Sequence, residues 1–133
     1  MIALLDTNVL LRFFTSDKSK KFKRLYEFFE TLERGDMRVE LKLIVIFQVI
    51  FVLKSYYDVP KGDIVSGIQN ILKYKGISIK EKKIVQRSLE LWSKKNVEIV
   101  DCYLIASLEK DSQNLLYSYD RDFDKFEVNR KEP

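Results

Sequence analysis

The sequence predicts an α/β fold, with a central parallel sheet and helices on both of its faces. Short apolar runs, of which residues 2–5 are the first, have the pattern of buried strands. Longer segments with helical spacing separate these runs, and this alternation favours parallel strands joined by right-handed crossovers. Because the 133 residues include only two prolines and four glycines, we see no linker and expect a single domain over residues 1–133.

The first predicted strand, residues 2–5, ends abruptly at Asp6, and a pattern suited to a helix follows over residues 9–14. Asp6 therefore stands at a strand end and a helix start together, which is where α/β folds place ligands. The structural interpretation of Asp6 is a helix N-cap, because an aspartate there accepts hydrogen bonds from backbone N–H groups. Both interpretations stay open from this stretch alone.

An amphipathic helix is predicted next, followed by a short alternating strand at residues 37–41. Gly35 is suited to ending the helix, since glycine adopts the left-handed conformation of a C-cap. The apolar residues of the helix have the spacing of one helical face: Phe22, Leu25, Phe29 and Leu32.

Residues 43–53 are almost wholly apolar and continue without a turn residue to Tyr57, which is too long for an ordinary strand. We predict a helix that is buried on most sides. A membrane helix needs roughly 20 apolar residues, and this run is too short to supply them. One face of the predicted helix contains Ile44, Phe47, Gln48 and Phe51.

The second half of the chain continues the alternation. Pro60 is suited to a first helical turn, and Ser78 followed by Glu81 has the pattern of a capping box that begins the next helix, which runs to about Asn96. Residues 97–100 then lead into a helix opened by Asp101, and a strand at residues 115–118 comes before two further carboxylates. The apolar helix positions are Ile64, Ile68, Ile71, Ile84, Leu91, Trp92, Ile105 and Leu108.

The composition excludes several kinds of chemistry. The chain has no histidine, so it cannot supply a Ser-His or Cys-His pair or a histidine-ligated zinc site. It also lacks the glycine-rich motifs that bind dinucleotides and nucleoside triphosphates. Cys102 is the only cysteine, so no intrachain disulfide can form. With no signal peptide at the amino terminus, we expect a cytoplasmic protein.

The net charge of +4 is modest, but part of it is concentrated where a helix is predicted to start. Positive charge opposes the helix dipole there. A solvated surface and a patch that meets the phosphates of a nucleic acid are both consistent with this cluster. Its members are Lys18, Lys20, Lys21, Lys23 and Arg24.

Carboxylates stand at three comparable points of the chain: Asp6 after a strand, Asp101 at a helix start, and Asp120 with Asp122 after another strand. Each has a structural interpretation, as an N-cap or as a turn residue. If the first and last of these strands belong to one parallel sheet, their carboxyl ends share an edge. Converging carboxylates repel one another and normally need a hard cation between them.

Three blocks of the sequence resemble those of PIN-domain ribonucleases: LLDTNVLLR at residues 4–12, IVDCYLIA at residues 99–106, and YDRDF at residues 119–123. The resemblance covers the whole chain in order, and it is strongest to the small VapC-like toxins of toxin–antitoxin pairs. It implies a Rossmann-like sandwich with an acidic pocket that binds Mg²⁺ or Mn²⁺.

The resemblance also implies roles for individual residues. Asp6, Asp101 and Asp120 take the metal-ligand positions, and Asp122 assists or substitutes for Asp120. The polar positions that line the family's pocket and orient carboxylates or water are Thr7, Asn8 and Ser118. Arginines at the pocket would steer the phosphate backbone, and in this chain they are Arg12 and Arg121.

One position departs from the family pattern, because Gln48 stands where the family usually has a glutamate on its second long helix. The glutamine keeps the length and an acceptor oxygen but loses the negative charge, so it would position water and contribute less to cation binding. Three interpretations stay open: a natural variant with weaker metal affinity, a member that has lost activity, or a deliberate inactivation.

The main functional hypothesis is a metal-dependent endoribonuclease, a hydrolase of RNA phosphodiester bonds. The alternative is a non-catalytic PIN-like module that binds RNA or a protein partner. A DNA-directed flap nuclease fits less well, because such enzymes carry additional helices for which this chain has no spare length.

The resemblance implies partners as well. A VapC-like toxin is held inactive by an antitoxin protein whose tail lies in a hydrophobic groove, and a homodimer is also expected. Aromatic residues could form the groove or the dimer face, although such residues at helical spacing usually belong to the core. They are Phe13, Phe14, Phe47, Phe51, Tyr56 and Tyr57.

Overall fold

The computed structural model describes residues 1–16 and 20–133, and its chain forms two compact units, Met1–Lys82 and Lys83–Pro133. Each unit is described by itself. A single domain over the whole chain stays a prediction. Within the described residues, no helix combines the length and the apolar character needed to cross a membrane.

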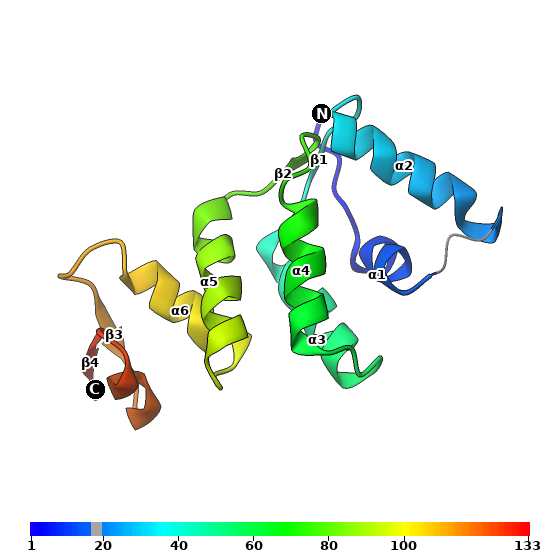
Figure 1. The fold of residues 1–133 in the computed structure, drawn as a ribbon. Coiled ribbons are helices and arrows are strands. Elements are labelled where there is room, and N and C mark those ends of the chain that lie inside the picture. Colours follow the sequence, from blue (N-terminus) through cyan, green and yellow to red (C-terminus); the bar gives the residue numbers. More distant parts are fainter. Residues whose placement is uncertain (17–19) are drawn as a thin grey trace. The chain divides into compact units, whose positions relative to one another are not determined.

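The first unit consists of helices around a small parallel arrangement of extended chain (Figure 1). Its elements in order are α1 (Thr7–Thr15), η1 (Lys20–Phe22), α2 (Lys23–Arg34), β1 (Val39–Glu40), α3 (Leu43–Ser55), α4 (Lys61–Ile71) and β2 (Ile77–Ser78). The helices predicted after Asp6, before Gly35 and over residues 43–53 are thus confirmed.

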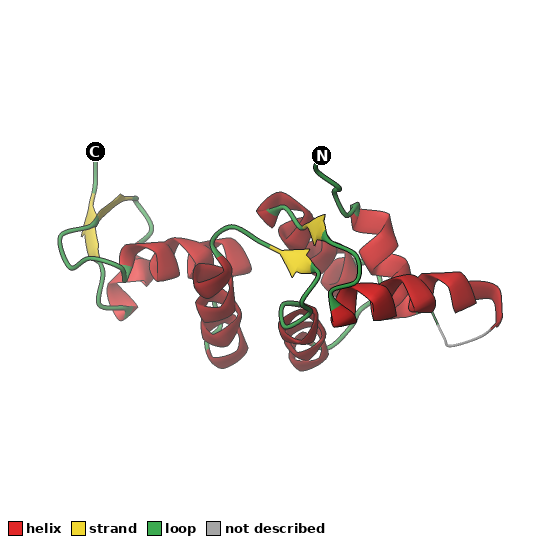
Figure 2. Ribbon diagram, turned by 90° about the horizontal axis from the view of Figure 1, so that it is seen from above, coloured by secondary structure: helices red, strands yellow, loops and turns green. Residues whose placement is uncertain are grey.

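The extended segments of this unit run parallel, as predicted. β1 pairs with β2, and Val39 lies opposite Ile77. The predicted first strand is reduced to a single parallel bridge between Leu4 and Glu40, in which the Glu40 amide donates to the Ala3 carbonyl over 2.7 Å. Figure 2 shows how short the strands are beside the helices, so a continuous central sheet stays a prediction.

The core of the first unit comes from the apolar faces of its helices, as their spacing predicts. α2 ends at Gly35, whose φ of 83° is the left-handed conformation expected of a C-cap. The Phe13 ring stacks on Phe29 with 3.8 Å between centroids. Deeply buried members are Leu10, Phe29, Leu32, Leu41, Ile46, Ile50, Ile64, Ile68, Ile71 and Leu72.

α3 is buried or half-buried on most sides, as predicted, and its exposed face contains Ile44, which is 76% exposed, and Phe51, which is 68% exposed. One expectation for this region was wrong. The capping box at Ser78 and Glu81 does not form. Ser78 belongs to β2, and its hydroxyl donates to the Val39 carbonyl over 3.3 Å, because strand pairing takes this residue out of the helix start.

The second unit contains two helices and a second short parallel pair. Its elements are α5 (Lys82–Lys94), whose first residue ends the first unit, α6 (Ile99–Leu108), β3 (Leu115–Tyr117), η2 (Arg121–Lys125) and β4 (Asn129–Lys131). β3 confirms the strand predicted at residues 115–118. β3 and β4 pair in parallel, with Leu116 opposite Arg130. Buried residues include Leu89, Trp92, Cys102, Ile105 and Phe123.

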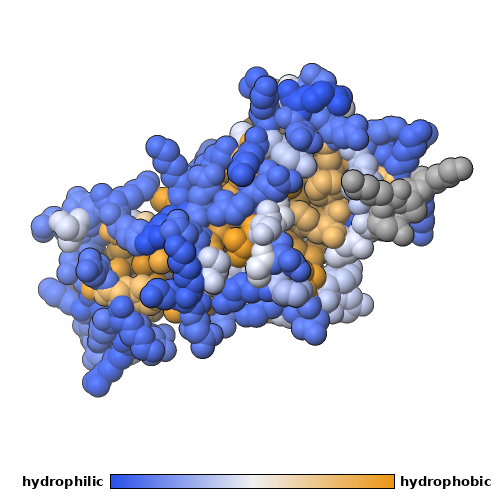
Figure 3. Space-filling view, viewed as in Figure 1, coloured by the Kyte–Doolittle hydropathy of each residue, from blue (hydrophilic) through white to orange (hydrophobic). Residues whose placement is uncertain are grey.

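The aromatic residues proposed for a groove or dimer face divide into two groups. Phe13 packs against Tyr26 as well as Phe29, so it belongs to the aromatic cluster between α1 and α2. Phe51 and Tyr56 are exposed, by 68% and 80%. On the face drawn in Figure 3, apolar side chains gather between larger hydrophilic areas.

Candidate functional site

Asp6 caps α1, so its structural interpretation is confirmed. Its backbone is extended, and its carboxylate oxygen Oδ1 accepts a hydrogen bond of 2.8 Å from the Thr7 amide. Asp6 follows the bridged segment at Leu4 directly, which places it at the carboxyl end of this parallel arrangement. The exposed carboxylate lies at the positive end of the helix dipole, and this position favours negative charge.

Thr7 links Asp6 to Gln48, the residue that stands where the family usually has a glutamate. Its hydroxyl donates to Gln48 Oε1 over 2.9 Å and so joins the start of α1 to the middle of α3. The first unit therefore brings together three of the predicted residues: Asp6, Thr7 and Gln48. Since the amide oxygen of Gln48 accepts from Thr7, the NH₂ group is the end that remains to donate.

Two other predicted residues lie on α1. Asn8 and Arg12 are both exposed, and Arg12 is in the last turn of the helix. Lys21, Lys23 and Arg24 of the basic cluster are exposed at the start of α2, whereas Lys18 lies outside the described residues and the Lys20 side chain is not described.

Asp101 lies in the first turn of α6 and is partly buried. It is not the N-cap, which corrects its structural interpretation: the helix begins two residues earlier, after Glu98. Burial raises the pKa of the Asp101 carboxyl, and the negative charges of Asp120, Glu98 and Asp122 raise it further. Glu98 was not predicted from the sequence, although it stands three positions before Asp101, a spacing that makes neighbours on a helix.

Asp120 and Asp122 lie in the loop that follows β3. The Asp120 amide donates to Ser118 Oγ over 3.0 Å, and Asp120 Oδ1 accepts from the Asp122 amide over 2.9 Å as the cap of η2. Their interpretation as turn residues is thereby confirmed. Asp122 also lies 3.5 Å from Lys125 in an exposed ion pair. The second unit thus brings Asp101, Asp120 and Asp122 within electrostatic reach.

The loop is also held by a residue of β4 that the sequence did not point to. Arg130 of β4 makes two hydrogen bonds to Asp124, at 2.8 and 3.0 Å, and a third of 2.9 Å to the Ser118 carbonyl. This ion pair lowers the pKa of Asp124, and the nearby charge of Arg121 lowers it further. Nothing in the polar run Asn129–Lys131 identified a strand.

The donors available to a metal in both units are oxygens, which suit a hard cation such as Mg²⁺ or Mn²⁺. Burial is the largest cause of the raised pKa of Asp101, and the repulsion by Asp120, Glu98 and Asp122 that adds to it is the part that a bound cation would relieve, so the acidic residues of the second unit fit such an ion in charge. Within the described part of either unit, no group of three or more acidic or cysteine side chains is close enough to hold a metal ion by itself.

Comparison with known proteins agrees with the resemblance. The PIN domain family matches residues 3–129. The chain is also 26% identical over 122 residues to a VapC ribonuclease of Aquifex aeolicus (strain VF5), and the match covers 92% of this chain and 90% of that protein. The family match spans nearly the whole chain and includes Asp6, Asp101 and Asp120. This chain belongs to the PIN-domain family.

Proposed function

We propose that this chain is a divalent-metal-dependent endoribonuclease that acts as the toxin of a toxin–antitoxin pair. Membership of the PIN-domain family and the likeness to a VapC ribonuclease support it. The observation that carries the proposal is the setting of Asp101, a partly buried carboxylate among three other acids. Such a setting costs folding free energy, and carboxylates perturbed in this way gather at functional sites.

In this proposal Asp6, Asp101 and Asp120 hold the cation, which is Mg²⁺ or Mn²⁺. When bound, it polarises a phosphate oxygen and activates water for attack on the phosphodiester. Asp120 presents its second oxygen because the first is held by the Asp122 amide. Asp6 is oriented in the same way by the Thr7 amide. These backbone hydrogen bonds fix the carboxylates before any ligand arrives.

The other polar residues of the proposed site act on water and on RNA. Gln48, held by the Thr7 hydroxyl, has a free NH₂ end with which to donate to water or to a phosphate oxygen. Asp122 assists Asp120, and the Ser118 hydroxyl oxygen holds the Asp120 amide. The exposed guanidinium groups of Arg12 and Arg121 attract the phosphate backbone of the RNA. Asn8 supplies a polar side chain of α1 to the proposed site.

The glutamine at position 48 lowers the nuclease activity that we expect of this chain. An amide attracts a divalent cation less than a carboxylate does, because it lacks the full negative charge. We therefore expect weakened cleavage from the chain as it stands and stronger cleavage from Gln48→Glu.

Cleavage of a broad panel of structured RNAs in the presence of Mn²⁺ tests the proposal. We expect Gln48→Glu to cut faster than the chain as it stands, and Asp6→Asn or Asp101→Asn in the Gln48→Glu background to remove the activity. If the Gln48→Glu protein leaves every RNA intact, the proposal is wrong.

A second candidate function is a non-catalytic PIN-like module that binds RNA or a protein. The observation in its favour is Gln48 itself, because its hydrogen bond with Thr7 is complete without a metal. Calorimetric titration separates the two candidates. The module predicts no Mn²⁺ binding that depends on Asp6, whereas the nuclease predicts binding that Asp6→Asn removes.

The partners proposed with the nuclease are RNA, an antitoxin and a second copy of the chain. Phe51, Tyr56 and Tyr57 are exposed towards the end of α3 and just beyond it, and the Tyr56 and Tyr57 rings lie 5.0 Å apart. Exposed apolar residues that gather in this way often mark a protein interface. A short gene directly upstream that encodes a protein with a DNA-binding amino terminus would identify the antitoxin.

A further inference from the structure

The Arg130 side chain joins three segments of the second unit. It extends from β4 and is only 12% exposed, and its Nε and Nη2 atoms donate two parallel hydrogen bonds to the Asp124 carboxylate. Its remaining nitrogen, Nη1, donates to the Ser118 carbonyl and lies 3.5 Å from Glu132. A planar guanidinium holds its partners in a fixed relative position, which the point charge of a lysine cannot do.

These contacts close both ends of one loop. Ser118 stands at its start and Asp124 near its end, and Asp120 lies between them. The interior of the loop is linked to the same frame, because the Asp120 amide donates to Ser118 Oγ and the Asp122 amide donates to Asp120 Oδ1. The position of the Asp120 carboxylate therefore depends on the two ends that Arg130 holds.

We infer that Arg130 is a positioning residue: by joining Ser118 to Asp124 it fixes the loop that presents Asp120, and so sets the affinity of the proposed nuclease for its divalent cation. The inference rests on the proposed function, since it takes Asp120 to be a ligand. It goes beyond that function, which gives Arg130 no role as a ligand of the cation or of the RNA.

A simpler effect of charge must be separated from this positioning effect. Removing Arg130 alone leaves Asp124 unpaired and adds negative charge beside the loop, which by itself would attract a cation more strongly. Removing the charge of Asp124 alone has the opposite effect. The double variant Arg130→Gln/Asp124→Asn keeps the net charge of the pair and still breaks the two-pronged ion pair.

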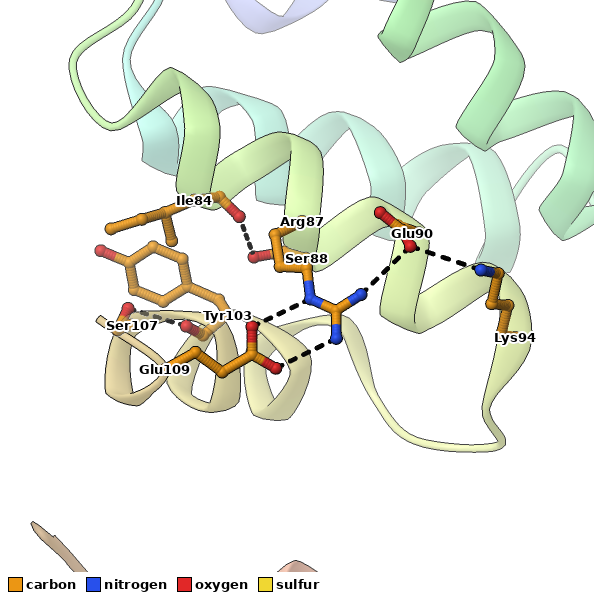
Figure 4. A network of polar contacts seen from close by, with 8 residues as sticks. All are labelled: Ile84, Arg87, Ser88, Glu90, Lys94, Tyr103, Ser107 and Glu109. Carbon is orange, nitrogen blue, oxygen red and sulfur yellow. Dashed lines mark hydrogen bonds and ion pairs between the residues drawn. The ribbon is translucent and has the colours of Figure 1, made fainter. Parts of the chain in front are cut away.

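The chain offers a matched control in the same unit. Arg87 of α5 makes the same kind of two-pronged pair with Glu109, at 2.9 and 3.1 Å, and a further bond with Glu90, as Figure 4 shows. None of these partners belongs to the loop that carries Asp120. Arg87→Gln therefore removes an equivalent ion pair without touching that loop.

The first measurement is amide hydrogen exchange of the full chain without metal, followed by mass spectrometry. We expect faster exchange over residues 118–124 in Arg130→Gln, in Asp124→Asn and in the double variant, and no change there in Arg87→Gln. Arg130→Lys should give an intermediate exchange rate, since it keeps the charge but loses the planar guanidinium that makes the two parallel hydrogen bonds. Unchanged exchange of the loop in the double variant overturns the inference.

The second measurement is Mn²⁺ affinity by calorimetry on the same proteins. Positioning predicts that all three loop variants bind about tenfold more weakly or worse, the usual effect of losing a residue that orients a ligand. Tighter binding by Arg130→Gln with unchanged binding by the double variant would show a charge effect and overturn the inference. If Arg130→Gln fails to fold, Arg130→Lys tests the same point, because it keeps the charge and loses the paired hydrogen bonds to Asp124.

Asp120→Asn separates this inference from the function on which it rests. If Asp120→Asn weakens Mn²⁺ binding while the Arg130 and Asp124 variants do not, the positioning role is wrong and the nuclease proposal stands. If Asp120→Asn leaves Mn²⁺ binding unchanged, the positioning role is wrong, and so is the ligand role that the proposed function gives to Asp120.

Discussion

Replacing Gln48 by glutamate changes one charge next to Asp6 and tests whether these two side chains face a common cation. Both are hydrogen-bonded to Thr7, Asp6 through a contact of 2.8 Å and Gln48 through one of 2.9 Å. The bonded atoms of Thr7 are about 3 Å apart within one residue. The two side-chain oxygens therefore lie no more than about 9 Å from each other.

At this distance two negative charges repel by about 0.5 kcal/mol in water and about 2 kcal/mol at an effective dielectric constant of 20. Both side chains are exposed, so the lower figure applies. The Thr7 hydroxyl bonds more strongly to a carboxylate than to an amide, by roughly 1 kcal/mol. These effects oppose each other, and we expect the metal-free free energy of unfolding to change by less than about 1 kcal/mol.

For cation binding no second effect opposes the first, because the added negative charge attracts a divalent ion near Asp6. A gain of about 0.7–1.4 kcal/mol corresponds to Mn²⁺ affinity that is three- to tenfold higher. Calorimetric titration at about 0.15 M salt measures this gain, and a larger rise of Tm with excess Mn²⁺ should accompany it. Gln113→Glu adds the same charge in the second unit and serves as the control.

Two results would refute this reasoning. One is a gain in Mn²⁺ affinity no larger than that of Gln113→Glu. The other is a gain that persists in the Asp6→Asn background, because Gln48 would then act without Asp6.

Two further predictions concern stability. Asp101→Asn should raise the free energy of unfolding at pH 7 without metal, by no more than about 1 kcal/mol once solvent screening at this partly exposed side chain is allowed for, because it removes a charge disfavoured by burial and by neighbouring acids. Because the pKa of Asp101 is raised in the folded protein, the free energy of unfolding of the unsubstituted chain should recover as the pH falls through that pKa. The free energies of unfolding of the two proteins should therefore converge below about pH 4. A difference that stays constant in urea titrations down to about pH 3 would contradict this. Gly76→Ala should lower stability by about 1–3 kcal/mol, because its Cβ would lie 2.0 Å from the Met37 carbonyl oxygen. Gly62→Ala, with nothing within 4 Å of its Cβ, should instead be neutral or stabilising by up to about 1 kcal/mol, and equal Tm values for the two variants would count against the packing described.

The sequence predicted those features that depend on neighbouring residues. The cap at Asp6 and the end of α2 at Gly35 follow from the backbone preferences of single residues, and both were confirmed. The apolar face of α4 follows from helical spacing in the same way. The sequence also supplied the three blocks that identify the family.

Features that depend on distant residues could not be predicted in this way. Ser78 has the local pattern of a capping residue, but its partner is the Val39 carbonyl, 39 positions earlier. The Thr7–Gln48 bond joins residues 41 positions apart. β4 has a polar sequence and forms by pairing with β3. For the same reason Arg130 gave no signal before its partners were known.

The most direct test of the central claim is the Mn²⁺ affinity of Asp6→Asn, Asp101→Asn and the protein with both changes, measured by calorimetry in the Gln48→Glu background. If both carboxylates hold the same cation, each single change should remove most of the binding, and the double change should add little. Binding that survives either single change unaltered would contradict the claim, as would losses that simply add.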